Sequence, residues 1–312
     1  MIEIMSAIAK GIKEVASKSI EAAKHLDPDA KAEVSSKETK GKNLKEFDPD
    51  AKAEISKSPI ELLKEQNPNG LEARKTYEIN EHKIETDDNG NPYVQNNKLL
   101  PDNEYELNNI NYKTDNNGNK SGWEGKITPE KYNPENARDK KAQMESGGQY
   151  RLDGDEGGHL VSRTLSGDSG IGNLEPMRAK INRGDYKVLE NEINNVVKNG
   201  QEVFDKGTIF RDDSKTFRPT KFEREISYGD TKKILKCDNV EGSTDLLNEL
   251  KGRIDDVDYK SLENRIKDMK NDGNKVSVTS TLENLNENKI KVVIRNETTG
   301  NAYPSFINII RR

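Results

Sequence analysis

One histidine in this sequence lies in a setting that could support chemistry. The stretch GDEGGHLVSR, residues 154–163, contains His159, which is one of only three histidines among 312 residues. Gly157 and Gly158 precede it directly, and glycines allow a backbone or a bulky substrate to approach closely. A neutral imidazole at such a place can take a proton from water as a general base. Because a single histidine is more often structural than catalytic, its assignment depends on the residues that accompany it.

Asn182 and Glu190 are the oxygen donors that could accompany this histidine. They are eight residues apart in a segment that we expect to form one helix. Eight residues span a little over two turns, so both side chains would lie on roughly one face, about 12 Å apart along the axis. They can then share one hydrated ion only if one of them acts through water. Hard oxygen ligands with several retained waters are typical of Mg²⁺ sites.

Hydrophobic periodicity predicts the elements that must position these side chains. Residues 172–200 predict a helix whose apolar side chains share one face and which ends at Gly200. Those apolar residues are Tyr186, Leu189, Ile193, Val196 and Val197. We expect residues 132–146 to form a second, polar helix and residues 154–163 to form an open acidic turn.

Alternating segments around short turns predict β-hairpins. Residues 75–94 and 108–125 alternate around Asn-Gly tips, and residues 220–237 alternate around Gly229-Asp230. Trp123 is expected to anchor the core beside one of these turns, with base stacking as the alternative.

At these residues the sequence resembles the DNA/RNA non-specific endonucleases, which are ββα-metal or His-Me finger nucleases. Asp155, the glycine pair, His159 and Leu160 look like the DxGGHL variant of the family signature. GNLEPM at 172–177 and NRGDYKVLE at 182–190 are similar to its second block. FRPTKFEREISYG, residues 217–229, resembles the strand pair of the branch found on bacterial secreted polymorphic toxins.

The resemblance implies a role for each matched residue. His159 is the general base that activates water, and Asn182 is the direct protein ligand of a single Mg²⁺, with Mn²⁺ as the alternative ion. Glu190 holds metal-bound water, and Asp155 shapes the turn. The metal would stabilise negative charge while in-line attack breaks the phosphodiester bond.

The sequence departs from the family pattern at positions that affect substrate binding. Glu156 stands where the family often has Arg, and Asn194 replaces the Arg that often follows the glutamate by one turn. Arg151 is therefore a candidate for the catalytic centre, and Arg138 and Arg178 are candidates for phosphate binding. An arginine in such a position is more often an ordinary surface charge, and this is the alternative for each of the three.

Composition narrows the class of protein. The chain is 34% charged, 30% hydrophobic and 5% aromatic, with a net charge of −5. The negative net charge argues against a protein that binds polyanions in general, but it is compatible with a local basic cleft. Cys237 is the only cysteine, which excludes an internal disulfide framework. No apolar run reaches membrane-spanning length, and no signal peptide opens the sequence, so export would need another route.

The regions before and after the endonuclease-like residues 75–239 have different sequence patterns from that segment. Residues 1–70 predict a linker or delivery remnant, with an amphipathic helix over 1–24 and a repeat in which LDPDAKAEVS recurs as FDPDAKAEIS 21 residues later. Residues 240–312 predict a partial duplication, because DYKSLENRI at 258 repeats DYKVLENEI at 185 in seven of nine positions. The copy contains no histidine, so it has no base.

In the copy, Asp255 and Glu263 correspond to Asn182 and Glu190 and are expected on one face of a helix. The apolar stripe of that helix is expected to pack against the first lobe, with an immunity-protein surface as the alternative. Its members are Tyr259, Leu262, Ile266 and Met269.

The sequence therefore predicts an α+β fold. We expect a ββα-metal (His-Me finger) nuclease with a central antiparallel sheet, a flexible helical N-terminal region and a C-terminal helix-plus-hairpin lobe. The predicted function is Mg²⁺-dependent, non-specific cleavage of DNA, with RNA as the alternative substrate.

The resemblance also implies an exported antibacterial toxin module with a cognate immunity protein. One alternative is a catalytically degenerate module of a secreted protein that binds nucleic acid or a partner. The other is a structural or adhesion protein. The oligomeric state stays open.

Overall fold

The computed structural model describes residues 57–312 except 166, 213–216, 285–287 and 311–312. The amphipathic helix predicted over 1–24 and the repeat that ends at residue 56 lie outside the described residues. None of the described helices combines the length and the apolar character that crossing a membrane requires.

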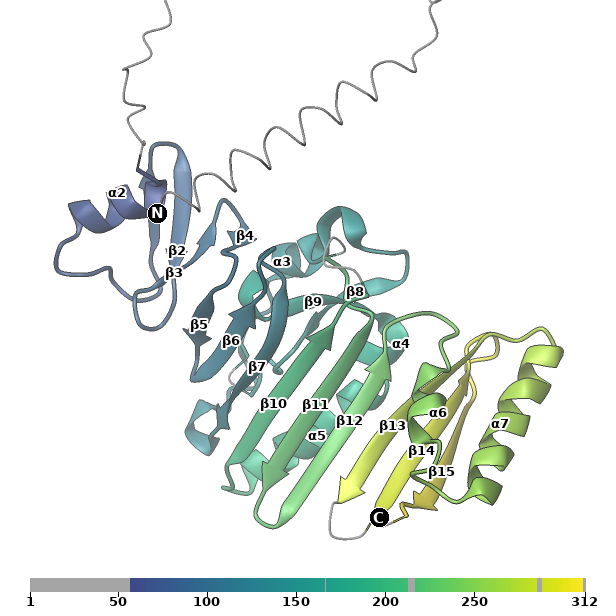
Figure 1. The fold of residues 1–312 in the computed structure, drawn as a ribbon. Helices are drawn as coiled ribbons and strands as arrows, with labels where there is room; N and C mark the ends of the chain where they lie inside the picture. Colours follow the sequence, from purple (N-terminus) through teal and green to yellow (C-terminus); the bar gives the residue numbers. More distant parts are fainter. Residues whose placement is uncertain (1–56, 166, 213–216, 285–287, 311–312) are drawn as a thin grey trace, which may run out of the picture. The chain divides into compact units, whose positions relative to one another are not determined.

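Strands make up most of the described secondary structure (Figure 1). The strands are β1 (Thr76–Ile79), β2 (His82–Thr86), β3 (Pro92–Gln95), β4 (Lys98–Leu99), β5 (Glu104–Leu107), β6 (Ile110–Thr114), β7 (Lys120–Ile127), β8 (Asp155–His159), β9 (Leu174–Arg178), β10 (Val203–Phe210), β11 (Lys221–Tyr228), β12 (Thr231–Asp238), β13 (Val276–Asn284), β14 (Lys289–Asn296) and β15 (Ala302–Asn308). The α-helices are α2 (Pro59–Gln66), α3 (Lys140–Glu145), α4 (Ala179–Asn182), α5 (Asp185–Lys198), α6 (Asp245–Leu250) and α7 (Asp256–Asn271).

The strands form one large antiparallel sheet and two small ones. The nine-stranded sheet has the order β15-β14-β13-β12-β11-β10-β7-β6-β5, and β1 to β4 form a four-stranded sheet. Strands β8 and β9 form a separate two-stranded ribbon that leads into α4 and α5. This arrangement confirms the predicted α+β class, the central antiparallel sheet and the ββα unit.

The predicted Asn-Gly tips are tight turns fixed by aspartate side chains. Asp115 Oδ1 accepts hydrogen bonds from the backbone N–H groups of Asn117 and Asn119, each at 2.9 Å. Gly118 has a φ of +77°, and a Cβ there would lie 2.6 Å from the carbonyl oxygen of Leu99. Glycine is therefore required at this tip, and the Asp115 side chain stabilises the turn through its hydrogen bonds.

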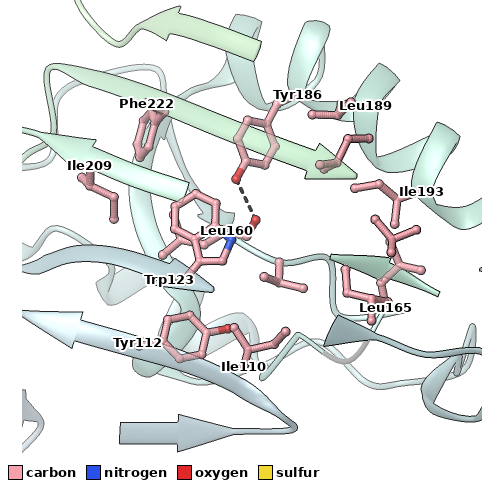
Figure 2. Close-up of a cluster of buried hydrophobic side chains, with 14 of the residues drawn as sticks. Ile110, Tyr112, Trp123, Leu160, Leu165, Tyr186, Leu189, Ile193, Ile209 and Phe222 are labelled. Atoms are coloured by element: carbon pink, nitrogen blue, oxygen red, sulfur yellow. Dashed lines mark hydrogen bonds between the residues drawn. The ribbon is translucent and has the colours of Figure 1, made fainter. Parts of the chain in front are cut away.

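The largest core lies between the central sheet and α5. The five apolar side chains that were predicted to share one helix face, from Tyr186 to Val197, lie on α5 and are all buried. Trp123 is 2% exposed and packs against Gly207, where any side chain would collide with the indole ring. Figure 2 shows Trp123 and Tyr186 in this cluster. The expected anchoring role of Trp123 is thus confirmed, because a ring so buried cannot stack on a base.

Three local expectations were wrong. The polar helix predicted over 132–146 is helical only in α3, which begins at Lys140, where Asp139 caps it by accepting the Ala142 N–H. The turn predicted at 154–163 begins with strand β8. The helix predicted over 172–200 includes strand β9 and is interrupted at Arg183 and Gly184, so Asn182 ends α4 while Glu190 lies within α5. The separation of about 12 Å that was expected along one helix axis therefore does not apply to Asn182 and Glu190, because they lie on two different helices.

The C-terminal residues extend the central sheet and have a core of their own. Strand β13 pairs with β12, with Cys237 opposite Thr279. The apolar stripe of α7 packs into a cluster formed by α6, α7 and β13 to β15, so the expectation that it docks on the first lobe was wrong. Three strands follow α7 rather than a hairpin. Asp255 caps α7 through the Val257 N–H and is not part of its face.

Candidate active site

A two-stranded ribbon positions the predicted base. In the β8–β9 pair, Asp155 lies opposite Arg178 at one end and His159 lies opposite Leu174 at the other. Strand β9 continues directly into α4, which ends at Asn182. The histidine and the asparagine, 23 positions apart in sequence, are thereby carried by one ββα unit.

Buried hydrogen bonds fix the chain just after His159. The Tyr186 hydroxyl donates to the Leu160 carbonyl oxygen at 2.7 Å, an interaction drawn in Figure 2. Asn173 is fully buried, and its Oδ1 accepts hydrogen bonds from the Val161 N–H and the Tyr112 hydroxyl, each at 2.9 Å. The imidazole is therefore held on a rigid support that joins α5, β6 and the segment before β9.

The imidazole of His159 is neutral near pH 7 and keeps one free nitrogen. Among the described residues, its Nε2 is buried without a hydrogen-bond partner. Burial, and after it the charges of Arg138 and Arg163, lower its pKa to about 4 against the opposing effect of Asp168. A buried nitrogen without a partner needs an explanation, and a water or a substrate group is the usual one.

Arg138 and Arg163 place positive charge around this histidine. Arg138, one of the predicted phosphate-binding residues, has a charge that lowers the pKa of the imidazole. Arg163 was not among them, although it follows the histidine by four residues in HLVSR. Two guanidinium groups near one unpaired imidazole nitrogen form a local basic environment in a chain of net charge −5. Such groups are suited to binding phosphate.

Asn182 directs its amide oxygen toward strand β8. Its Nδ2 donates to Glu156 Oε2 at 2.8 Å, and because an ionised carboxylate can only accept, the amide oxygen must face the other way. A Cβ placed on Gly158 would lie 3.2 Å from Asn182 Oδ1. The oxygen therefore lies against the residue that precedes His159, and Gly158 leaves the space between them open.

Glu156 connects Asn182 with Arg183. Burial alone would raise the pKa of Glu156, but hydrogen bonds from Arg183 and Asn182 lower it, so the carboxylate stays ionised. The sequence analysis recorded Glu156 only as a departure from the family pattern. The contact with Asn182 arises from folding across 26 residues and has no signal in the spacing.

Glu190 is buried beside charges of the central sheet. It accepts a hydrogen bond from Lys187 Nζ at 3.2 Å. Burial raises its pKa, while Arg224 and Lys187 act in the opposite direction and Asp205 adds to the rise. The interactions described for Glu190 thus involve α5 and strands β10 and β11, and its predicted contact with metal-bound water stays a prediction.

The other predicted site residues are engaged in fixed contacts. Both carboxylate oxygens of Asp155 pair with Arg218, at 2.7 and 2.8 Å, which fixes the start of β8. Arg151 donates to the carbonyl oxygens of Gln143, Met144 and Asp155, and Arg178 donates to Glu297 and to the Val240 carbonyl. Roles of Arg151 in chemistry and of Arg178 in phosphate binding stay predictions, while Arg218 was missed by the sequence analysis.

The described residues fit a metal site that has few protein ligands. They contain no group of three or more His, Cys, Asp and Glu side chains arranged to hold an ion. A site with one direct ligand does not need such a group. The oriented amide oxygen of Asn182 is a hard donor on the same ββα unit as the unpaired nitrogen of His159, and hard oxygen donors suit Mg²⁺ and Mn²⁺.

Comparison with known proteins gives the family. No curated protein matches the sequence. The structure is similar to a crystal structure of NucA from Streptococcus agalactiae with no metal bound, at 16% identity and a TM-score of 0.37 over 58% of this chain and 90% of that chain. For NucA from the same organism with a magnesium ion bound, the values are 14% identity and a TM-score of 0.38 over 58% and 89%. These TM-scores are low, so the assignment rests on sequence.

The sequence match covers the candidate site. Residues 101–229 match the family described as DNA/RNA non-specific endonuclease, and this range includes His159, Asn182 and Glu190. The chain therefore contains, at residues 101–229, a domain of the DNA/RNA non-specific endonuclease family.

Proposed function

We propose that this chain is a metal-dependent endonuclease that hydrolyses phosphodiester bonds of DNA without sequence specificity, with RNA as a second substrate. The observation that carries the proposal is the buried Nε2 of His159, which has no hydrogen-bond partner among the described residues, on the same ββα unit that carries Asn182. Both lie within the range that matches the endonuclease family.

Each polar group at the site has a distinct task in this proposal. Arg138 and Arg163 attract the phosphate. His159 Nε2 accepts a proton from water as the water oxygen attacks phosphorus, the bond to the leaving oxygen breaks, and that oxygen takes a proton from solvent. Asn182 Oδ1 would hold a Mg²⁺ or Mn²⁺ ion, which when bound supplies charge stabilisation for the phosphate. Glu156 keeps the Asn182 amide in the orientation that this requires.

The proposal predicts that His159→Ala abolishes cleavage and leaves the fold intact. Loss of a general base typically costs about 10²–10⁴-fold in rate. The assay incubates supercoiled plasmid with wild-type or variant protein in Mg²⁺, in Mn²⁺ or in EDTA, and circular dichroism checks the fold. Glu202→Ala, which removes one partner of an exposed ion pair, is the matched control and should cleave like the wild type.

The same assay distinguishes the alternatives. Near-wild-type cleavage by a folded His159→Ala variant would contradict the mechanism. Plasmid binding without cleavage by the wild-type protein, in the presence of metal, would favour the degenerate binding module. A parallel assay on single-stranded and structured RNA decides the range of substrates.

We also propose that this enzyme is a secreted toxin that an immunity protein blocks in the producing cell. The resemblance of residues 217–229 to the toxin branch supports this, and these residues lead into and form β11. Induced expression in a bacterial cytoplasm should stop growth with the wild-type chain and not with His159→Ala. Equal growth of both strains, at equal protein levels, would contradict the toxin role.

A further inference from the structure

The segment that carries Asn182 is held from its far side by the C-terminal strands. It runs from Arg178, the last residue of β9, to Asp185, the first residue of α5. Strands β13 and β14 contact Asp185, and Glu297, which follows β14, contacts Arg178. Both strands and Glu297 lie outside the range 101–229 that matches the endonuclease family.

One end of the segment is tied to Glu297, the residue that follows β14. The Arg178 guanidinium donates to Glu297 Oε1, and Lys180 Nζ donates to the Glu297 carbonyl oxygen. The Glu297 side chain is 1% exposed, and the Arg178 side chain is 11% exposed. This is therefore a desolvated ion pair rather than a surface contact. The fully buried Asn239 adds a hydrogen bond of 2.8 Å from the Arg178 N–H to its Oδ1.

The other end of the segment is tied to Arg295 and Thr279. Arg295 donates to Asp185 Oδ2 through Nη2 at 2.6 Å and through Nε at 3.2 Å, and the Thr279 hydroxyl donates to the same oxygen at 2.7 Å. Glycine is needed at position 184, because a Cβ there would collide with the Lys180 carbonyl oxygen.

Between these two ties the chain has little support from its own secondary structure, although Asn182 and Arg183 also bind Glu156 and Ile181 is buried in the main core. Helix α4 is one turn long, its N-cap residue Arg178 makes no side-chain capping bond, and the helix ends at Asn182. Gly184, the N-cap of α5, also lacks a side-chain capping bond. A single turn is not stable by itself, so its position is set by tertiary contacts.

We propose that strands β13 and β14 position Asn182 through Arg178 and Asp185, and that Arg295 and Glu297 thereby set the metal affinity of the site. This inference rests on the proposed function, because it takes Asn182 as the metal ligand. It assigns a task to the histidine-free C-terminal region: it supports the ligand segment and adds no second site.

The test measures metal binding by the full-length chain without nucleic acid. Electron paramagnetic resonance of Mn²⁺ gives the dissociation constant for the wild type, Arg295→Ala and Glu297→Ala. We expect a rise of about tenfold in each variant, as for other residues that orient a metal ligand. Hydrogen exchange of the backbone amides of residues 179–187 should become faster in the same variants. At saturating metal, kcat should stay within about twofold, since the reacting groups are unchanged.

Two further variants separate positioning from general stability. Arg265→Ala is the control, because this arginine lies in the same lobe over the Tyr303 ring and away from the ligand segment. It should bind Mn²⁺ like the wild type even if its melting temperature falls. Arg295→Lys keeps the charge but not the forked guanidinium, so its affinity should lie between those of the wild type and Arg295→Ala. Arg295→Lys and Glu297→Gln replace the alanine variants if those do not fold.

The outcomes distinguish this inference from the proposed function. Asn182→Ala is the reference, and loss of Mn²⁺ binding in it with unchanged binding in the Arg295 and Glu297 variants would overturn the positioning role alone. Wild-type Mn²⁺ binding by Asn182→Ala would overturn the ligand assignment of the proposed function and the positioning role with it.

Discussion

The protonation of His159 depends on burial and on three charged neighbours. A free imidazole would take up a proton below about pH 6.5. Here burial is the largest cause of a pKa of about 4; Arg138 and Arg163 also lower the pKa, and Asp168 raises it. The base is therefore neutral, and able to accept a proton, throughout the range from neutral pH down to about pH 5.

This predicts an unusually low acid limb for the cleavage reaction. Activity should persist as the pH falls through 6.5 and should be lost only as His159 takes its proton near pH 4. The pH dependence of kcat/KM on a short duplex, at saturating Mg²⁺, gives the position of the limb. A limb near pH 6.5 would show that the imidazole is solvated as in a free histidine.

Two substitutions should move this limb in opposite directions. Arg138→Ala removes a positive neighbour, so the pKa of His159 and the limb should rise. Asp168→Asn removes the negative neighbour, so both should fall. The two shifts are read from the same pH profiles, and shifts of the same sign would contradict the electrostatic account.

At the scale of elements, the contact between β10, β11 and α5 depends on one buried ion pair. Arg224 on β11 and Asp205 on β10 are both 0% exposed and are joined at 2.6 Å. The Tyr186 ring of α5 lies 4.8 Å from the guanidinium carbon, and Trp123 donates to Asp205 Oδ1 at 3.2 Å. The pair thus connects the sheet to the helix whose tyrosine hydroxyl binds the chain next to His159.

Removal of one partner should therefore unfold the site-bearing region more easily. Asp205→Ala leaves a buried guanidinium unpaired, and we expect a loss of about 3–5 kcal/mol in the free energy of unfolding. Urea titration followed by circular dichroism measures it. Glu202→Ala, at a pair whose side chains are more than half exposed, should change the value by less than about 0.5 kcal/mol. Similar losses in both variants would mean that burial of the pair does not matter.

The elements show how far sequence reasoning can reach. Period and turn residues were enough for the hairpins and for the apolar face of α5, because those signals are local. The interruption at Arg183 and Gly184 was not foreseen, nor was the contact of the next residue, Asp185, with Arg295, which is 110 positions away. Likewise His159 and Asn182 were found through motif and residue type, whereas Glu156, Arg163 and Arg218 act through contacts that only the fold creates.

At the scale of the whole molecule, hydrophobic clusters divide the described chain. The main cluster ends in sequence at Cys237, and the C-terminal cluster begins at Leu246, although β12 and β13 join them in one sheet. The predicted boundary between residues 239 and 240 falls between these two clusters. The C-terminal region is thus a separate core in a continuous sheet, which suits it to support α4 without contributing a base.

The boundary on the N-terminal side, predicted near residue 70, can be tested by two truncations. Helix α2 begins with a capping box at Ser58, and Leu63 packs with Ile79 and Ile84 of the small sheet, at 3%, 7% and 0% exposure. Removal of residues 1–56 leaves this cluster whole, so melting temperature and plasmid cleavage should match those of the full chain. Removal of residues 1–70 uncovers the cluster, and burial of one leucine alone is worth about 1.5–3 kcal/mol.

The second truncation should therefore melt at a lower temperature, while His159, which lies in another sheet, should keep its environment. Differential scanning calorimetry of the two truncated chains beside the full chain provides the comparison. Equal melting of both truncations would place residues 57–70 with the linker, as the composition alone predicts. A loss of cleavage on removal of residues 1–56 would instead mean that the N-terminal region takes part in binding the substrate.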